Sequence, residues 1–256
     1  MSTTVAKILA RLRQLPLSTL IIWAAGLIFC TVSVEAFHEL GEAILRQTGT
    51  GATLPIDSTI LNVLHDLHSP TLDVLAIALT TLGYFPIVMA LTVIVDAIWI
   101  RAREIVSAIT LTIIVMGAPL IDTALKGVYQ RHRPIGYMYL ITESDYSFPS
   151  GHSFAGMAFY VGFAFLLTYR QRWRIRILAV ATSLLLAVCI AASRVYFGVH
   201  FPTDVLGGLL MGLVWVVLVL LGSSPWRKRT PERAPPSAAS PWPSQLVGKT
   251  PRERRS

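Results

Sequence analysis

Six stretches of this sequence are apolar and long enough to cross a lipid bilayer, and no other feature constrains the fold as strongly. A helix needs about 20 residues to cross, at a rise of about 1.5 Å per residue. The predicted spans cover residues 17–37, 72–100, 105–128, 153–169, 177–194 and 203–221. The second span has 29 residues, so we expect it to tilt, to bend at Pro86 or to start late. The sequence therefore predicts an all-α, polytopic membrane protein whose six transmembrane helices form a helical bundle.

Composition and cysteine usage exclude several other classes of protein. Charged residues form 14% of the 256-residue chain, against about 25% in soluble domains, and hydrophobic residues form 54%. This balance excludes a disordered chain and a typical cytosolic enzyme. The two cysteines, Cys30 and Cys189, lie inside apolar stretches, so we expect small core side chains and not the disulfides of a secreted domain.

Basic residues set the expected orientation in the membrane. Seventeen of the 22 Lys and Arg residues fall on one side of a six-span bundle, which the positive-inside rule assigns to the cytoplasm. Both termini are then cytoplasmic, with residues 1–16 before the first span and 17–222 forming the transmembrane domain. Residues 223–256 hold eight Lys and Arg and seven of the 15 prolines, which predicts a disordered cytoplasmic tail that contacts anionic headgroups. Because most of the net charge of +8 belongs to this tail, we expect no nucleic-acid partner.

Two of the outer loops are expected at residues 38–70 and 129–152. The first contains an amphipathic stretch, 60–67, which should lie along the membrane surface. Few cysteines and the absence of a glycosylation sequon in these loops favour a bacterial plasma membrane, that is, the inner membrane. A cleavable signal peptide ending near Ala36 is an alternative reading of the first span, although its apolar run of about 18 residues is long for one.

Five basic residues fall outside the cytoplasmic set, and four of them cluster at the outer ends of the third and fifth spans. They are Arg46, Lys126, Arg131, Arg133 and Arg194. Charges at a membrane boundary are candidates for function, and snorkelling anchors are the alternative. Lys126 and Arg133 are seven residues apart, close to two turns, so we expect both on one face of a helix that Pro134 ends. Asp122, one turn before Lys126, should form a buried salt bridge with it.

Two histidine-containing segments lie at the same predicted surface. In the Pro-Ser-Gly-His segment at 149–152, Ser150 suits a helix N-cap and Gly151 allows close approach of the backbone to a ligand. Free N–H groups at the start of a helix bind anions. After the fifth span, Asp204 falls in the first turn of the sixth helix, within reach of His200. A carboxylate that holds one imidazole nitrogen leaves the other nitrogen free to react.

Together these residue types can bind and transfer a phosphoryl group. Guanidinium groups match phosphate oxygens bidentately, so two arginines and a lysine, with backbone amides, form a cradle. One histidine can attack phosphorus while the other protonates the departing oxygen and later activates water. With so much fixed positive charge, we expect no metal and no cofactor.

The three segments resemble the signature of the type 2 phosphatidic acid phosphatase family, which also includes the vanadium-dependent haloperoxidases. The pattern is Lys-x6-Arg-Pro, Pro-Ser-Gly-His and Ser-Arg-x5-His-x3-Asp, and the chain matches every fixed position from Lys126 to Asp204. The resemblance covers about residues 57–221. It implies a six-span helical phosphatase whose substrate, a lipid phosphate or pyrophosphate, enters from the outer leaflet.

The resemblance also implies a role for each motif residue. His200 would be the nucleophile that forms a phosphohistidine, Asp204 its orienting partner and His152 the general acid. The implied phosphate-binding residues are Lys126, Arg133, Ser150, Gly151 and Arg194.

Several alternatives stay open. A transporter, or a lipid-phosphate-binding protein without hydrolase activity, would also carry charges in its spans, although here they lie at one surface and not at midplane. Undecaprenyl pyrophosphate is the first candidate substrate, and phosphatidylglycerophosphate, phosphatidate and lysophosphatidate present the same terminal group. The oligomeric state is left open. We expect no catalytic role for His38, His65, His68 or His132, and a role in helix packing for Gly208 and Gly212.

Overall fold

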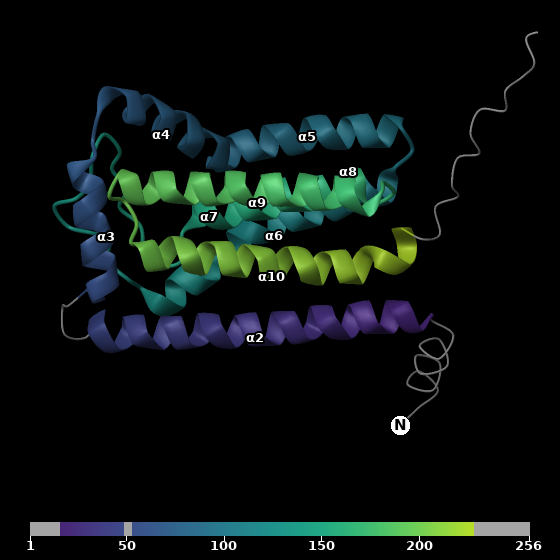
Figure 1. Ribbon diagram of the computed structural model, residues 1–256, viewed down its shortest axis with the longest axis horizontal. Coiled ribbons are helices and arrows are strands. Elements are labelled where there is room, and N and C mark those ends of the chain that lie inside the picture. The colour runs from purple at the N-terminus through teal and green to yellow at the C-terminus, as the bar shows by residue number, and fades with distance from the viewer. Residues whose placement is uncertain (1–15, 49–52, 228–256) are drawn as a thin grey trace, which may run out of the picture.

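The structure is a computed structural model that describes residues 16–48 and 53–227, and within these residues it is helical with no strand. Its elements are α2 (Leu17–Thr48), α3 (Pro55–Asp66), α4 (Pro70–Gly83), α5 (Phe85–Arg101), α6 (Ile105–Tyr129), α7 (Gly151–Gly156), the π-helical turn η1 (Met157–Val161), α8 (Gly162–Thr168), α9 (Trp173–Tyr196) and α10 (Pro202–Arg227). The long helices lie side by side along one axis (Figure 1).

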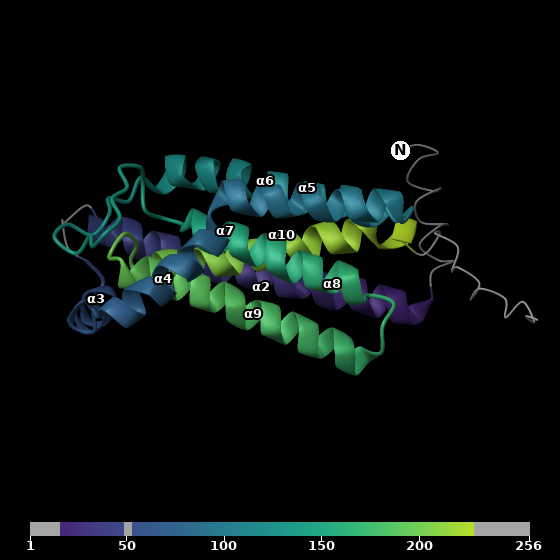
Figure 2. The same ribbon diagram turned by 90° about the horizontal axis from the view of Figure 1, so that it is seen from above.

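The number of spans agrees with the prediction. Five helical segments of the described chain are long and apolar enough to cross a membrane, and α4 with α5, bent by 56° between them, makes six if the pair is counted as one span. The bend falls at Tyr84, and Pro86 lies in the first turn of α5. Proline has no N–H to donate and its ring clashes with the carbonyl four residues earlier, so α4 cannot continue through this point. The bend lets α4 pack on α9 while α5 packs on α6 (Figure 2).

The first predicted outer loop is largely helical. Helix α2 continues to Thr48, beyond the predicted span end at Phe37, and α3 occupies most of the remainder. Helix α3 lies across one end of the bundle, at a steep angle to the long helices (Figure 1). Its apolar residues Ile56, Ile60 and Val63 are exposed, whereas its opposite face buries Asp57 and Leu61. This arrangement supports the expectation of a helix at the membrane surface.

Close packing of α10 on α7 and η1 brings two motif segments together. A Cβ on Gly208 would lie 2.5 Å from the carbonyl oxygen of Ser150, and one on Gly212 would lie 2.8 Å from Cβ of Met157. Only glycine therefore permits this approach, which confirms the predicted packing role of both residues. As a result, the Ser150 N–H donates to the carbonyl oxygen of Asp204 at 3.0 Å.

The boundaries of the predicted terminal segments are only partly described. Helix α10 extends to Arg227, so its last turn covers the first residues of the predicted tail. Residues 1–15 and 228–256 lie outside the described residues. The cytoplasmic N-terminus and the Pro-rich tail therefore stay predictions.

We predict that the end of the bundle carrying the motifs faces outward while both termini face the cytoplasm. Thr142 is exposed at that end, and Gln171 is exposed at the opposite end, between α8 and α9. In intact cells, an impermeant thiol reagent should label Thr142→Cys and leave Gln171→Cys unlabelled until the membrane is permeabilised. A reporter fused after Ser256 should behave as cytoplasmic. The reverse labelling pattern would overturn the topology.

Candidate active site

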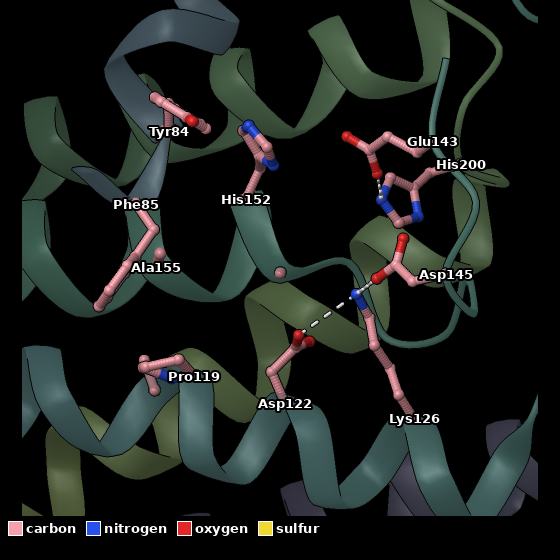
Figure 3. Close-up of a pocket in the computed structure, with 13 residues that line it drawn as sticks. Tyr84, Phe85, Pro119, Asp122, Lys126, Glu143, Asp145, His152, Ala155 and His200 are labelled. Carbon is pink, nitrogen blue, oxygen red and sulfur yellow. Dashed lines mark hydrogen bonds and ion pairs between the residues drawn. The ribbon is translucent and has the colours of Figure 1, made fainter. Parts of the chain in front are cut away.

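The three motif segments meet at one end of the bundle, where α6 and α9 finish and α7 and α10 begin. There they enclose a cavity of about 290 Å³ beside the break between α4 and α5 (Figure 3). Apolar lining comes from Phe85, Ala118, Pro119 and Ala155, and charged or titratable lining from Asp122, Lys126, Glu143, Asp145, His152 and His200. One part of the cavity can therefore hold an anion while another offers an apolar wall.

Lys126 reaches the cavity from the last turn of α6. Its Nζ lies 3.3 Å from Oδ2 of Asp122 and 2.6 Å from Oδ2 of Asp145. The predicted salt bridge with Asp122 is therefore confirmed. The predicted helix end is wrong, because α6 stops at Tyr129 and Gln130 takes a left-handed conformation with φ of 42°. Pro134 does not end this helix, and Arg133 does not share a helix face with Lys126.

Arg133 nevertheless enters the site, from the loop that follows α6. Its Nη1 donates to the carbonyl oxygen of Val199 at 2.7 Å and lies 3.1 Å from Nε2 of His200. Its Nη2 lies 2.6 Å from Oε2 of Glu143 and also pairs with Asp145. The guanidinium thus contacts both the loop of residues 130–150 and the segment that carries His200.

Arg194, in the last turn of α9, is the third cation and is only 1% exposed. Its Nη1 donates to the hydroxyl of Thr80 at 2.7 Å, and its Nη2 pairs with Glu143. Within the described residues, the buried Nε has no hydrogen-bond partner. Because a buried donor without an acceptor is costly, this N–H is available to an anion that enters the site.

His200 is 1% exposed and lies between Arg133 and Asp204. Its Nδ1 is 3.5 Å from Oδ2 of Asp204, close but without hydrogen-bond geometry. A guanidinium can only donate, so the contact with Arg133 makes Nε2 the acceptor and puts the ring proton on Nδ1, facing Asp204. Burial lowers the pKa of His200, and the nearby negative charge of Asp204 offsets this only in part, so the neutral ring is favoured. Nε2 therefore carries the lone pair that a nucleophile needs, and in this structure that lone pair accepts from Arg133.

The backbone turn before His200 depends on a glycine. Gly198 has φ of +65°, and a Cβ there would lie 2.0 Å from the carbonyl oxygen of Tyr137. No other residue type fits this position without moving the loop. The turn therefore fixes how the His200 segment packs on the loop of residues 130–150.

His152 lies across the cavity from His200 and is partly buried, with its ring stacked over Tyr84 at 6.3 Å between centroids (Figure 3). A Cβ on the neighbouring Gly151 would lie only 3.0 Å from Oδ2 of Asp122. Ser150 precedes the helix as predicted, but its side chain makes no capping hydrogen bond. Its Oγ accepts from the Ser153 hydroxyl at 3.1 Å.

Sequence reasoning missed the two carboxylates of the outer loop. Glu143 bridges Arg133 and Arg194, and Asp145 bridges Lys126 and Arg133. All three cations of the expected phosphate cradle are thus paired with carboxylates. Acidic residues in a predicted outer loop, between two basic motifs, were the available signal. The carboxylates contact the cations that the sequence predicts to bind phosphate.

The remaining histidines lie outside the cavity, as expected. His68 stacks on Tyr139 with 4.0 Å between ring centroids, and its Nε2 lies 2.9 Å from the carbonyl oxygen of Tyr196. His65 packs edge to face against His68. His38 lies 3.2 Å from Glu42 on α2, and His132 is exposed.

Comparison with known proteins agrees with this architecture. A family model described as the PAP2 superfamily matches residues 101–228, half of the chain. Phosphatidylglycerophosphatase B of Bacillus subtilis is 31% identical over 174 residues, which cover 66% of this chain and 84% of that protein. An undecaprenyl-diphosphatase of Sulfolobus acidocaldarius is 36% identical over 117 residues, covering 44% of this chain and 52% of that protein. The crystal structure of a transmembrane PAP2-type phosphatidylglycerolphosphate phosphatase from Bacillus subtilis matches with a TM-score of 0.69 at 27% identity, covering 80% of this chain and 98% of that one.

We predict that Asp145 competes with phosphate for its cations. Burial tends to raise the pKa of Asp145, but hydrogen bonds from Lys126 and Arg133 outweigh it and lower the pKa to about 2, so the carboxylate is ionised at neutral pH. A partly exposed ion pair contributes up to about 1 kcal/mol, so Asp145→Asn should lower the dissociation constant of orthophosphate by about twofold to fivefold. Calorimetry on the purified protein at fixed ionic strength measures this.

The matched control is Asp66→Asn, which removes an exposed carboxylate from α3 outside the cavity. It should leave phosphate affinity unchanged. Unchanged or weaker binding in Asp145→Asn would show that this carboxylate does not compete.

Proposed function

The chain belongs to the PAP2 superfamily and is a multi-pass membrane lipid phosphatase, and we propose that it hydrolyses a lipid phosphate or diphosphate through a phosphohistidine formed on His200. The observation that carries this proposal is the position of Arg133, whose guanidinium contacts His200 and both carboxylates that occupy the cradle. A phosphoryl group that replaces those carboxylates comes within reach of the nucleophilic nitrogen.

The first step is displacement of the lipid at phosphorus. The phosphoryl oxygens take the places of the Glu143 and Asp145 carboxylates on Lys126, Arg133 and Arg194, with the buried Nε of Arg194 as a further donor. Nε2 of His200 attacks phosphorus as the bond to the lipid oxygen breaks. His152, across the cavity, gives its proton to that oxygen.

The second step is hydrolysis of the phosphohistidine. His152, now neutral, takes a proton from a water molecule, and the resulting hydroxide attacks phosphorus. The bond from phosphorus to Nε2 breaks, which returns His200 to its starting form and leaves inorganic phosphate in the cradle. Three fixed cations balance the charge of the transferred group, so the proposed reaction uses no metal and no cofactor.

Substrate choice is proposed from the relatives and from the wall of the cavity. Phe85 and Pro119 line the side that faces the break between α4 and α5, where a lipid chain can pass from the bilayer to the cradle. Undecaprenyl diphosphate is our first candidate, supported by the similarity to an undecaprenyl-diphosphatase. Phosphatidylglycerophosphate is the second, supported by the relative with the longer match. With the proposed topology, the substrate comes from the outer leaflet of a bacterial inner membrane.

A phosphate-release assay over a panel of lipid phosphates tests the function directly. The purified protein in detergent should release phosphate from undecaprenyl diphosphate, with phosphatidylglycerophosphate, phosphatidate and lysophosphatidate as the comparison set. Preference is measured as kcat/KM. No release from any member of the panel would contradict a phosphatase and favour a binding protein.

We predict that His200→Ala abolishes turnover while the protein still inserts and folds. Removal of a nucleophile typically lowers the rate by several orders of magnitude, so kcat should fall at least about 1000-fold. His132→Ala is the matched control, because His132 lies in the neighbouring motif but is exposed and outside the cavity. Retention of more than about a tenth of wild-type activity by His200→Ala would refute the assignment.

We also predict that activity survives chelation and is inhibited by vanadate. The fixed cations supply the positive charge that a metal would otherwise supply, so EDTA dialysis should leave most of kcat intact. Vanadate can adopt the trigonal-bipyramidal shape of phosphoryl transfer and should bind more tightly than phosphate. Loss of activity in EDTA that magnesium restores would contradict this reading of the site.

A further inference from the structure

A buried ion cluster lies directly behind Asp204, away from the phosphate cradle. Nη1 of Arg131 donates to Oδ1 of Asp204 at 2.6 Å and to the hydroxyl of Thr203 at 2.7 Å, and its Nη2 donates to Oδ2 of Asp57 at 2.7 Å. Arg131 is 3% exposed, and both carboxylates are fully buried. None of the proposed steps uses Arg131 or Asp57, and neither residue lines the cavity.

Thr203 closes the cluster through its backbone and its hydroxyl. Its N–H donates to Oδ1 of Asp57 at 2.9 Å, and its hydroxyl donates to Oδ2 of the same carboxylate at 2.7 Å. Asp57 belongs to α3 and Thr203 to the first turn of α10. The cluster therefore joins the helix at the end of the bundle to the turn that carries the nucleophile.

Stability alone does not account for such a cluster. Burying charged groups costs much of what their attraction returns, and apolar replacements of buried ion pairs are often equally stable. A buried network of this kind next to a reactive histidine therefore points to a role in the reaction.

The geometry fixes the rotation of the Asp204 carboxylate. Arg131 holds Oδ1, and the backbone N–H of Phe201 donates to Oδ2 at 2.8 Å. With both oxygens held, Oδ2 is the one that faces Nδ1 of His200. Without Arg131, Oδ1 would lose its partner, and the Phe201 N–H alone would hold the carboxylate.

The charges of the cluster match what the attack on phosphorus requires. Two carboxylates and one guanidinium leave one net negative charge beside His200. When Nε2 attacks while Nδ1 keeps its proton, the imidazole ring becomes cationic, and that negative charge stabilises it. If Asp57 were neutral, Arg131 would cancel the charge of Asp204 and the ring would lose this support.

We infer that Arg131 and Asp57 are positioning residues that hold Asp204 oriented and keep the cluster negatively charged for attack by His200. This inference rests on the proposed phosphohistidine mechanism. It assigns α3 a part in the reaction, because Asp57 belongs to this helix. Within the described residues, α3 contributes no other member of the cluster.

Three variants test the inference: Asp57→Asn, Arg131→Met and the double variant. The substrate is whichever of undecaprenyl diphosphate or phosphatidylglycerophosphate the wild type hydrolyses faster, and kcat is expressed per folded molecule after size-exclusion chromatography. Each single variant should lower kcat by about 30-fold or more, with KM changed by less than about threefold, because neither residue touches the substrate. The double variant restores one net negative charge. Its kcat relative to wild type should therefore exceed the product of the two relative kcat values of the single variants by at least about tenfold.

Arg131→Lys is the conservative variant and should retain more activity than Arg131→Met, because lysine keeps the positive charge and loses only the bidentate geometry of the guanidinium. The matched control is Arg170→Met, which breaks an arginine–glutamate pair with Glu104 at 2.9 Å, at the far end of the bundle. It should leave kcat unchanged. If the single variants fold and keep wild-type kcat, if only KM changes, or if their effects simply multiply, the inference is wrong.

Failure of the proposed function would look different from failure of this inference. A wild type that releases no phosphate, or whose activity survives His200→Ala, refutes the mechanism itself. A wild type that depends on His200, combined with fully active Arg131 and Asp57 variants, refutes the positioning role alone.

Discussion

The guanidinium of Arg133 joins the parts of this protein that must act together. It binds the backbone of the His200 segment, the imidazole itself and the carboxylates of the outer loop. The His200 segment and the outer loop that carries these carboxylates are far apart in sequence. Burying a cation at the end of an apolar bundle is costly unless it is paired, so these contacts hold the loop against the helix ends.

The same electrostatic requirement explains how the site can be both stable and ready to react. Lys126, Arg133 and Arg194 would repel one another if they were unpaired, and Glu143 and Asp145 neutralise them in the absence of substrate. A phosphoryl group carries comparable negative charge and can exchange with these carboxylates at small net cost. In the proposed mechanism, binding is an exchange of anions, and the loop of residues 130–150 adjusts when it occurs. Behind His200, a second cluster built on Arg131 holds the orienting carboxylate in place.

Much of the fold followed from sequence because membrane insertion leaves few alternatives to apolar helices. The spans, the pair formed by Lys126 and Asp122, and the packing of the glycines on α10 were all predicted, and the bend near Pro86 was one of three alternatives expected for the second span. The end of α6 was predicted wrongly, because helical periodicity gave no warning of the left-handed residue at Gln130.

The pairing of the motif residues with Asp57, Glu143 and Asp145 could not be predicted, because an acidic residue in an outer loop does not indicate which cation it will contact. Asp57 lies 74 positions from Arg131, and Glu143 lies 51 positions from Arg194, so only the packing of α3 and the outer loop brings these charges together. Arg131 was noticed as a charge at the outer surface, but its role depends on where its guanidinium points. Local patterns identify the residues that a reaction needs, whereas the side chains that hold them in place become visible only in the folded chain.

The central claim is that His200 carries the phosphoryl group, and trapping that intermediate tests it most directly. Protein mixed with a lipid phosphate radiolabelled in its terminal phosphoryl group is quenched within milliseconds in alkali and digested. We expect the label on the peptide that contains His200, stable in alkali and lost in acid, as a phosphoramidate behaves. Label on an acid-stable or alkali-labile peptide, or phosphate release with no labelled protein at any quench time, would contradict the account.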